Sequence, residues 1–549
     1  MMKYFAATAA LLALMQGSLC ADDPIFDVKA LSSTPLNPRV ISAVEKKGIV
    51  TETVRFHSET DGRQDVDIFA FFSYPKGARN LPAFIWNQGG LSQASPGATS
   101  KPAARGYAVM CIDFPQPTYR STGDYPINSG LHVGPDPHKA PIYHGVVALL
   151  KAVSYLETRP EVDRDRIGIA GASWGGFFST LMVGIDPRLK VGSCLYGCGS
   201  LQLGNAWWDG VSRSSAVPVG PAERERWRTT LDPAWRLPTK TTPIGWFTGT
   251  NDAFYSMPAL MKSYQMAAGE KHLTLVPNWD HALSRQQGEE QVLGWLDTIL
   301  KGRRVFPTVA PVRVENEGGR LIARWSFDGN GATADLIASY GEPGNWRGRY
   351  WHTFTAHIHG KTCQAELPAS RLPCFVSGSV TSGEGYRSST PLLRVDAAAL
   401  GVKASTLVPD FDGCEKWGAF EEDAIAYLSI HTRGGQRRWF PNLSADAREG
   451  KHSAILGAGE IVLPPILCTA NVPSRFSCYF KAVRPVDVTV KLGDKMKTFQ
   501  VSTTWTKIEM DFTPPNPLMG VFPASLSSSG GANVLVDAIS FHPLPITGP

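Results

Sequence analysis

Apolar and amphipathic stretches alternate along the first 300 residues of the chain. Apolar runs with the length of buried strands occur at residues 81–86, 107–112, 167–170 and 244–248. Apolar positions with helical spacing occur at residues 142–158, 177–185 and 289–301. Because strand and helix patterns alternate, residues 21–302 are predicted to form a doubly wound α/β domain.

The pattern changes after residue 303. Prolines mark a linker there, and the following segment has short alternating runs, frequent glycine and no long amphipathic helix. We therefore expect an all-β sandwich at residues 305–398. A further β-rich unit is expected at 402–549, with strands at 475–483, 486–491 and 533–541.

The first twenty residues have the features of a secretory signal peptide. Lys3 precedes an apolar stretch, and small residues stand before Ala21, where a signal peptidase would cut. A lipoprotein anchor at Cys20 is the alternative, although Leu19 occupies a place where small residues are preferred. We expect cleavage of residues 1–20 and a periplasmic or extracellular protein.

In such a compartment the remaining cysteines can form disulfides, and the best candidate is a bond between Cys363 and Cys374.

Composition limits the possible functions. The chain has 549 residues, which predicts two to four domains, and 43% of its residues are hydrophobic against 19% charged. The net charge of +5 is spread without a Lys/Arg cluster, so nucleic acid is not an expected partner. No apolar run of 18 residues follows the first twenty, so we expect no membrane insertion.

Residues 171–176, with the sequence GASWGG, have the strongest chemical pattern in the chain. They follow a predicted strand and precede a predicted helix, the context of a nucleophile elbow with Ser173 at its tip. A serine there projects above the sheet at a helix N-terminus, where an oxyanion is stabilised. Ser173 is therefore the predicted nucleophile.

A serine hydroxyl needs a base, and the base needs an orienting carboxylate. In this kind of fold the order along the chain is serine, acid, histidine. Asp252 and His281 each follow a predicted strand, at the edge of the sheet where α/β proteins bind ligands. We predict that Asp252 is the acid and His281 the base, with Asp280 a weaker candidate for the acid.

An oxyanion hole needs two backbone donors. The N–H of Trp174, the residue after the nucleophile, is the first candidate. The second is expected from the turn after the strand at 81–86, at Gln88 or Gly89, where Asn87-Gln88 stand in place of a common His-Gly pair.

These motifs resemble α/β-hydrolases of the acetyl xylan esterase, dienelactone hydrolase and prolyl-oligopeptidase type. The resemblance covers roughly residues 50–302. It is carried by Tyr143-His144, Arg159-Pro160-Glu161-Val162-Asp163, Arg166-Ile167-Gly168, Gly171-Ala172-Ser173-Trp174-Gly175-Gly176, Tyr196-Gly197-Cys198-Gly199, Gly249-Thr250-Asn251-Asp252 and His281. It implies a Ser173–His281–Asp252 triad, ester or peptide substrates and no cofactor or metal.

The β-rich units resemble accessory modules. The middle unit resembles fibronectin type III and other immunoglobulin-like domains, and we expect it to be a spacer. The last unit begins with Leu407-Val408-Pro409-Asp410-Phe411 and Trp417, continues through residues 504–512 and closes with residues 534–539. This order resembles carbohydrate-binding jelly rolls of the galactose-binding type, which implies glycan binding, with Trp439 as a candidate contact and Trp505 as a core residue. In the α/β domain, Trp207 and Trp208 either stack on a sugar or pack inside a cap.

Three functions follow from these expectations. The first is a secreted serine carbohydrate esterase that removes acetyl or similar groups from a polysaccharide. The second is a prolyl-oligopeptidase-type serine peptidase. Such peptidases carry a β-propeller with blades of about 40–45 residues, and too few residues precede the α/β domain for one, which favours the esterase. The third is a glycan-binding surface protein whose hydrolase domain is inactive.

Overall fold

The computed structural model describes part of the chain. The described residues are 23–549 except 63, 91, 127–130, 209–219, 253, 280, 282, 342, 344–345, 347–348, 350, 405–441, 457–458, 463–470, 514–523, 530–533 and 545–549. The predicted signal peptide at 1–20, the weaker acid candidate Asp280 and Trp439 lie outside this part.

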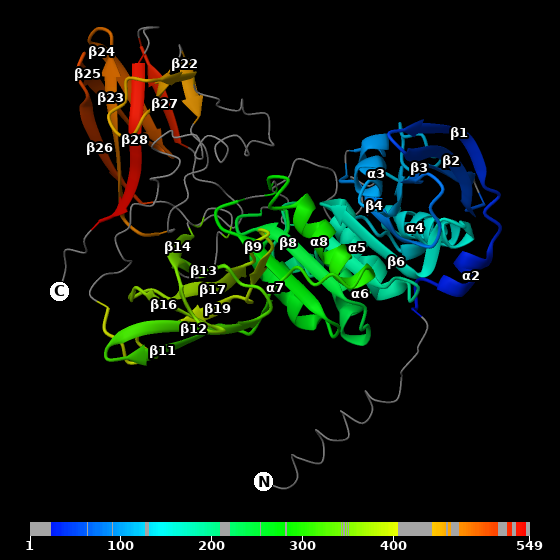
Figure 1. Cartoon of the computed structure of the whole chain (residues 1–549). Helices are drawn as coiled ribbons and strands as arrows, with labels where there is room; N and C mark the ends of the chain where they lie inside the picture. Colours follow the sequence, from blue (N-terminus) through cyan, green and yellow to red (C-terminus); the bar gives the residue numbers. More distant parts are fainter. Residues whose placement is uncertain are drawn as a thin grey trace.

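Nine strands of the described residues form one large sheet (Figure 1). In spatial order they are β1 (Arg39–Lys46), β2 (Ile49–Thr60), β3 (Asp65–Pro75), β5 (Ala108–Ile112), β4 (Leu81–Asn87), β6 (Val162–Ala172), β7 (Val191–Leu195), β8 (Ile244–Gly249) and β9 (Lys271–Val276). The first three are antiparallel, and the six from β5 to β9 run parallel to one another. The sheet is mixed, and β5 precedes β4 in its spatial order although β4 comes first along the chain. This is the arrangement of an α/β-hydrolase fold, which confirms the predicted fold class.

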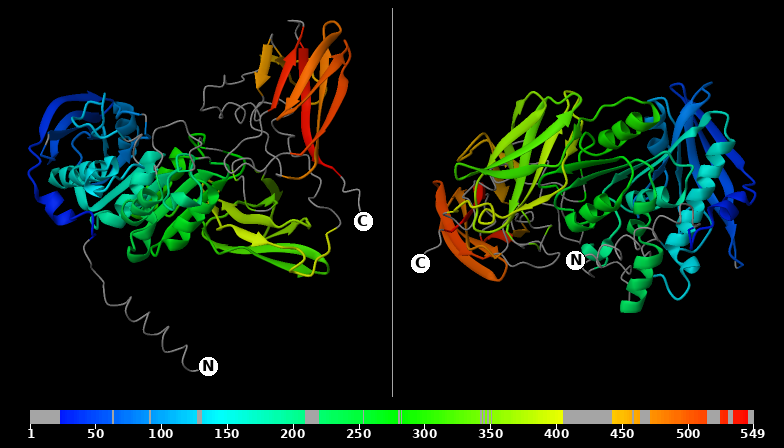
Figure 2. Two further views of the ribbon diagram at one scale, coloured as in Figure 1. Left: turned by 180° about the vertical axis from the view of Figure 1, so that it is seen from behind. Right: turned by 90° about the horizontal axis from the view of Figure 1, so that it is seen from below.

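Helices cover both faces of this sheet (Figure 2). The helices of this region are α2 (Val28–Ser33), α3 (Pro96–Ala103), α4 (Pro141–Thr158), α5 (Trp174–Ile185), α6 (Pro221–Thr230), α7 (Met257–Met266) and α8 (Glu289–Leu300), and of these α3, α4, α5 and α8 contact the strands directly. Arg105, just after α3, pairs with Glu290 and Asp297 of α8. On the other face, α4 contacts α2 and α5. Because helices shield both faces, the central strands are buried throughout, as their apolar runs predict.

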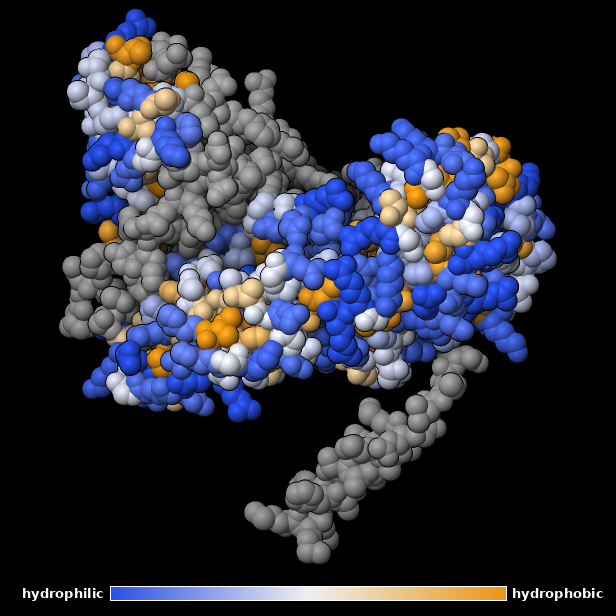
Figure 3. Space-filling view, in the orientation of Figure 1, coloured by the Kyte–Doolittle hydropathy of each residue, from blue (hydrophilic) through white to orange (hydrophobic). Residues whose placement is uncertain are grey.

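The outer strand β1 differs from the central ones. All eight of its residues are exposed, and Val40, Ile41 and Val44 form an apolar patch on the surface (Figure 3). The sequence analysis did not identify β1–β3 as antiparallel strands. The burial of β2 alternates along its length, as is typical of an antiparallel strand, whereas β3 is more continuously buried.

The middle unit consists of two antiparallel sheets around a shared core. One sheet contains β10 (Thr308–Val309), β11 (Arg313–Glu317), β12 (Arg320–Asp328), β15 (His357–His359) and β16 (Thr362–Leu367), and the other β13 (Thr333–Tyr340), β14 (His352–Thr355), β17 (Cys374–Thr381), β18 (Arg387–Ser389) and β19 (Leu393–Val395). Val402 also packs into this core. Cys363 on β16 and Cys374 on β17 are buried free thiols in different sheets, so the predicted disulfide between them is wrong.

The last described unit is also built from two antiparallel sheets, with a separate apolar core. One contains β20 (Asn442–Ser444), β21 (Ser453–Leu456), β23 (Ser474–Ala482), β26 (Thr506–Phe512) and β28 (Val534–Pro543), and the other β22 (Gly459–Val462), β24 (Val486–Leu492), β25 (Lys495–Val501) and β27 (Ala524–Ser528). The succession of an α/β region and antiparallel all-β sheets is the predicted one.

The middle unit covers the edge of the large sheet at β9. The N–H of Leu275 donates to Ser389 Oγ at 3.0 Å, and Arg387 Nε donates to the Leu275 carbonyl at 3.1 Å. Ile337 and Phe375 of the middle unit belong to the same apolar cluster as the core of the α/β region. The two regions therefore share a packed interface.

A buried histidine at this interface gives a pH-dependent contribution to stability. His272 packs against the rings of Phe306 and Trp295, and burial lowers its pKa from 6.5 to about 3. Above pH 6.5 both folded and unfolded chains hold it neutral. As the pH falls toward 3, only the unfolded chain takes up the proton, so the free energy of unfolding decreases by about 2 kcal/mol between pH 7.5 and pH 5.

His272→Gln removes this titration and keeps a polar side chain beside Thr274, whose hydroxyl oxygen lies 2.9 Å from the His272 ring. Urea unfolding at pH 7.5 and pH 5 is expected to show a smaller acid-induced loss in His272→Gln than in the wild type. Equal losses in the two proteins would contradict the assignment.

Candidate active site

Ser173 lies at a sharp turn between β6 and α5. Its φ of 59° and ψ of −121° are strained for a residue with a side chain, and its N–H donates to the Leu195 carbonyl at 2.9 Å. Glycines on both sides permit this turn: a Cβ at Gly171 or Gly175 would lie within 2.7 Å of the Asn87 backbone oxygen. The sequence therefore forms the predicted elbow, with the serine at its tip.

Three side chains from separate strand ends meet at this turn. His281 Nε2 lies 2.8 Å from Ser173 Oγ, and His281 Nδ1 lies 2.9 Å from Asp252 Oδ2. Asp252 follows β8 and His281 follows β9, so the parallel strands deliver both to the edge of the sheet at which β6 ends. The structure thus brings together the predicted nucleophile, base and acid.

The Asp252 carboxylate is buried and held on several sides. Its Oδ1 accepts the backbone N–H groups of Phe254 and Tyr255 at 2.8 and 2.9 Å, and its Oδ2 accepts the Thr248 hydroxyl at 3.2 Å. These bonds satisfy the buried charge and fix the face that it presents to His281. The arrangement can orient an imidazole that removes a proton from the serine.

Aromatic rings surround the histidine. The centroids of Tyr196 and Phe254 both lie 4.8 Å from the His281 centroid, and that of Tyr255 lies 6.0 Å away. The Tyr196 hydroxyl accepts the N–H of Leu283, which ties the segment after His281 to the end of β7. Sequence reasoning missed these rings as site residues, although Phe254 and Tyr255 directly follow the acid at a strand end.

The predicted oxyanion donors lie beside Ser173. Trp174 is the first residue of α5, so its N–H is among those that a helix leaves without an internal partner. A Cβ at Gly89 would lie 3.5 Å from Ser173 Cβ, which places the Gly89 backbone against the nucleophile. Burial raises the pKa of the Cys111 thiol to about 12, and a hydrogen bond from the Gln88 side chain opposes this effect. The role of Gln88 as an oxyanion donor stays a prediction.

Trp207 and Trp208 are buried, with 8% and 6% of their surfaces exposed. Trp207 stacks on Trp174 with centroids 4.9 Å apart, and the Arg224 guanidinium lies over Trp208 at 5.2 Å. Asn205 Oδ1 accepts the N–H groups of both tryptophans. The described structure shows packing for both rings, and their binding of sugar stays a prediction.

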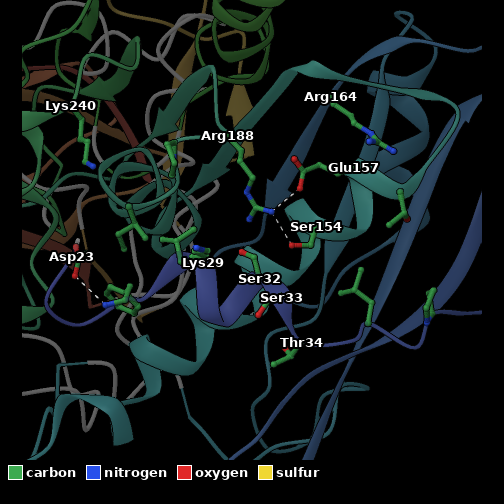
Figure 4. A pocket seen from close by; sticks show the side chains of 17 residues that line it. Asp23, Lys29, Ser32, Ser33, Thr34, Ser154, Glu157, Arg164, Arg188 and Lys240 are labelled. Atoms are coloured by element: carbon green, nitrogen blue, oxygen red, sulfur yellow. Dashed lines mark hydrogen bonds and ion pairs between the residues drawn. The ribbon is translucent and has the colours of Figure 1, made fainter. Parts of the chain in front are cut away.

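A groove of about 1030 Å³ lies elsewhere, lined by α2 and by the carboxyl-terminal ends of α4 and α5 (Figure 4). Arg188 is directed toward Glu157 and Ser154 there, at 2.8 and 2.9 Å. Arg164, near the start of β6, also lines the groove, whereas Ser173 follows the end of the same strand. The groove is therefore separate from the serine site.

Among the described residues, no three His, Cys, Asp or Glu side chains are grouped so that they could hold a metal ion. No helix in the described ranges combines the length and the apolar character needed to cross a membrane.

The chain matches no known family model and no curated protein. Solved structures with a similar arrangement include an acetyl xylan esterase from Paenibacillus sp. R4, with 19% identity over 50% of this chain and 92% of that chain and a TM-score of 0.42. Acetyl xylan esterase 1 from Thermoanaerobacterium sp. JW/SL YS485 has 18% identity over 50% and 95% of the two chains, also at 0.42. An acylaminoacyl peptidase from Pyrococcus horikoshii has 15% identity over 50% and 44%, at 0.37. Each similarity covers about half of this chain.

Proposed function

We propose that the protein is a serine hydrolase that cleaves carboxylic esters, and that its substrates are acetylated polysaccharides. The observation that carries the hydrolase proposal is the unbroken chain of contacts from Ser173 Oγ through the His281 ring to the buried Asp252 carboxylate. A strained serine with a base at 2.8 Å is an arrangement for nucleophilic attack on an acyl group.

In the proposed reaction, Ser173 Oγ attacks the ester carbonyl while His281 Nε2 takes the hydroxyl proton. The backbone N–H of Trp174 and a donor at Gln88 or Gly89 stabilise the oxyanion of the tetrahedral intermediate. His281 then gives its proton to the departing alcohol, which leaves an acyl-enzyme on Ser173. Water, activated by the same ring, releases the acid and restores the serine.

The choice of acetylated polysaccharide rests on sequence motifs. Residues 50–302 resemble acetyl xylan esterases, and the last unit resembles carbohydrate-binding modules. Glycan binding by that unit is part of the proposal. So is export after cleavage of residues 1–20, which lie outside the described part of the chain.

Product release from competing substrates tests this proposal. The purified protein is expected to release acetate from acetylated xylan and to hydrolyse p-nitrophenyl acetate faster than longer p-nitrophenyl esters. A fluorophosphonate should label Ser173, as located by mass spectrometry, and labelled protein should lose both activities.

Two outcomes would replace the proposal. Faster release of p-nitroaniline from peptide anilides than of acetate would identify a peptidase. Binding of polysaccharide without turnover or labelling would identify a glycan-binding protein with an inactive hydrolase domain.

A further inference from the structure

A loop of the middle unit reaches the strand ends that carry Asp252 and His281. Trp351, in this loop, is fully buried and belongs to the apolar cluster of the hydrolase core. The neighbouring Arg349 is also buried. The middle unit therefore contributes residues to the interior beside the candidate active site.

Asn278 lies three residues before His281. Both polar atoms of its side-chain amide form hydrogen bonds with the backbone of Trp351 in this loop. Its Nδ2 donates to the Trp351 carbonyl at 2.7 Å, and its Oδ1 accepts the Trp351 N–H at 2.7 Å. Asn278 has a φ of 61°, in the left-handed region that asparagine tolerates better than most residues. The pair of bonds fixes the start of the segment that carries His281.

Asn251, directly before Asp252, makes a second connection to the same loop. Its Nδ2 donates to the Arg349 carbonyl at 2.6 Å, and its backbone N–H donates to the Trp279 carbonyl at 2.8 Å. The N–H of Asn278 donates to the Thr250 hydroxyl at 2.9 Å. The acid and base segments are thus bonded to each other and to one loop of the middle unit.

Arg349, one of the described residues of this loop, is held by several contacts of its side chain. The Arg349 guanidinium donates to Ser339 Oγ at 3.0 Å and to the carbonyls of Tyr340 and Gly341 at 3.0 and 2.9 Å. It also lies over the Phe375 ring at 5.1 Å. Because Arg349 ties the loop back to the end of β13, the carbonyl that meets Asn251 has a fixed position.

We propose that the middle unit is a working part of the active site, with Asn251 and Asn278 as positioning residues that hold Asp252 and His281 in register with Ser173. This inference rests on the proposed hydrolase function. It replaces the expected spacer role, in which the middle unit only separates two modules. A misplacement of about 1 Å in a reacting group can cost about a hundredfold in rate.

Asn278→Gly tests the first connection. Glycine adopts a positive φ without strain, so the variant keeps the backbone conformation and deletes the two bonds to Trp351. For p-nitrophenyl acetate we expect kcat to fall by about tenfold to a hundredfold, with KM changing by less than about threefold. The rate at which a fluorophosphonate labels Ser173 should fall in parallel.

Asn251→Ala tests the second connection and is expected to lower kcat in the same way. Gln291→Ala is the matched control. Gln291 lies on α8, away from the segments that carry Asp252 and His281, and its side chain bonds to the backbone of Gly385 and Arg387 in the middle unit. It removes a comparable number of interface bonds and should leave kcat unchanged. Thermal unfolding of all three variants measures any loss of stability separately from kcat.

The outcomes separate this inference from the function on which it rests. A wild-type protein without turnover or labelling overturns the proposed function. An active wild type whose Asn278→Gly and Asn251→Ala variants keep kcat, whatever their stability, overturns the positioning role alone. If Asn278→Gly does not fold, Asn278→Asp takes its place, because it still accepts the Trp351 N–H and loses only the donor.

Discussion

Ser173→Ala is expected to lower kcat for p-nitrophenyl acetate by about 10⁴-fold or more, with little change in KM. The substitution removes the atom that forms the acyl-enzyme and leaves Asp252, His281 and the backbone donors in place. Residual activity above the uncatalysed rate would come from oxyanion stabilisation and binding alone. Steady-state kinetics measures the loss, and mass spectrometry should find no fluorophosphonate adduct.

Ser154→Ala is the matched control for this variant. Ser154 lies on α4 and bonds to the Leu150 carbonyl and to Arg188, in the groove that is separate from the site. We expect it to keep the wild-type kcat. A Ser173→Ala protein with the activity of Ser154→Ala would show that another residue is the nucleophile.

Gly175→Ala is the second variant with a large expected effect. A Cβ at Gly175 would lie 2.2 Å from the Asn87 carbonyl oxygen and 2.6 Å from its carbon. Both atoms are backbone at the end of β4, so neither can rotate away, and the start of α5 must move off the sheet. We expect a loss of about 3 kcal/mol or more in the free energy of unfolding. Esterase activity should also be lost, because Ser173 and the Trp174 N–H move with the helix.

Gly97→Ala separates this clash from the general effect of replacing a helical glycine. Gly97 lies in α3, and a Cβ there would meet nothing within 4 Å. Alanine is favoured over glycine inside a helix by up to about 1 kcal/mol, so this variant should be neutral or slightly more stable. Urea unfolding compares the two. Equal stability and activity in both would mean that α5 does not approach β4 so closely.

The parts of the fold that sequence predicts well are those with a repeated apolar pattern. The expected helix at 142–158 corresponds to α4 at Pro141–Thr158, and the one at 289–301 to α8 at Glu289–Leu300. The strands expected at 475–483 and 486–491 correspond to β23 and β24. Because each element buries one fixed side, its apolar residues recur at a regular spacing, and this spacing does not depend on what the element packs against.

The meeting of Ser173, Asp252 and His281 was predictable for a related reason. Each residue follows a strand of a parallel sheet, and the carboxyl ends of such strands share one edge. The contacts of Asn251 and Asn278 with the middle unit were not predictable. Their partners are the backbone N–H and carbonyl groups of residues 349 and 351, which any amino acid other than proline can supply and which leave no residue-type pattern.

The cover that β18 provides for the edge of β9 has a consequence for synthesis of the chain. Translation proceeds from the amino terminus, so all nine strands of the large sheet have been synthesised before residues 387–389. During that interval β9 is an open edge, with the Leu275 N–H and carbonyl still lacking their partners Ser389 and Arg387. The nascent α/β region therefore depends on a later stretch of the same chain to close its edge, and a ribosome that stalls between the two would leave a strand open to pairing with other chains.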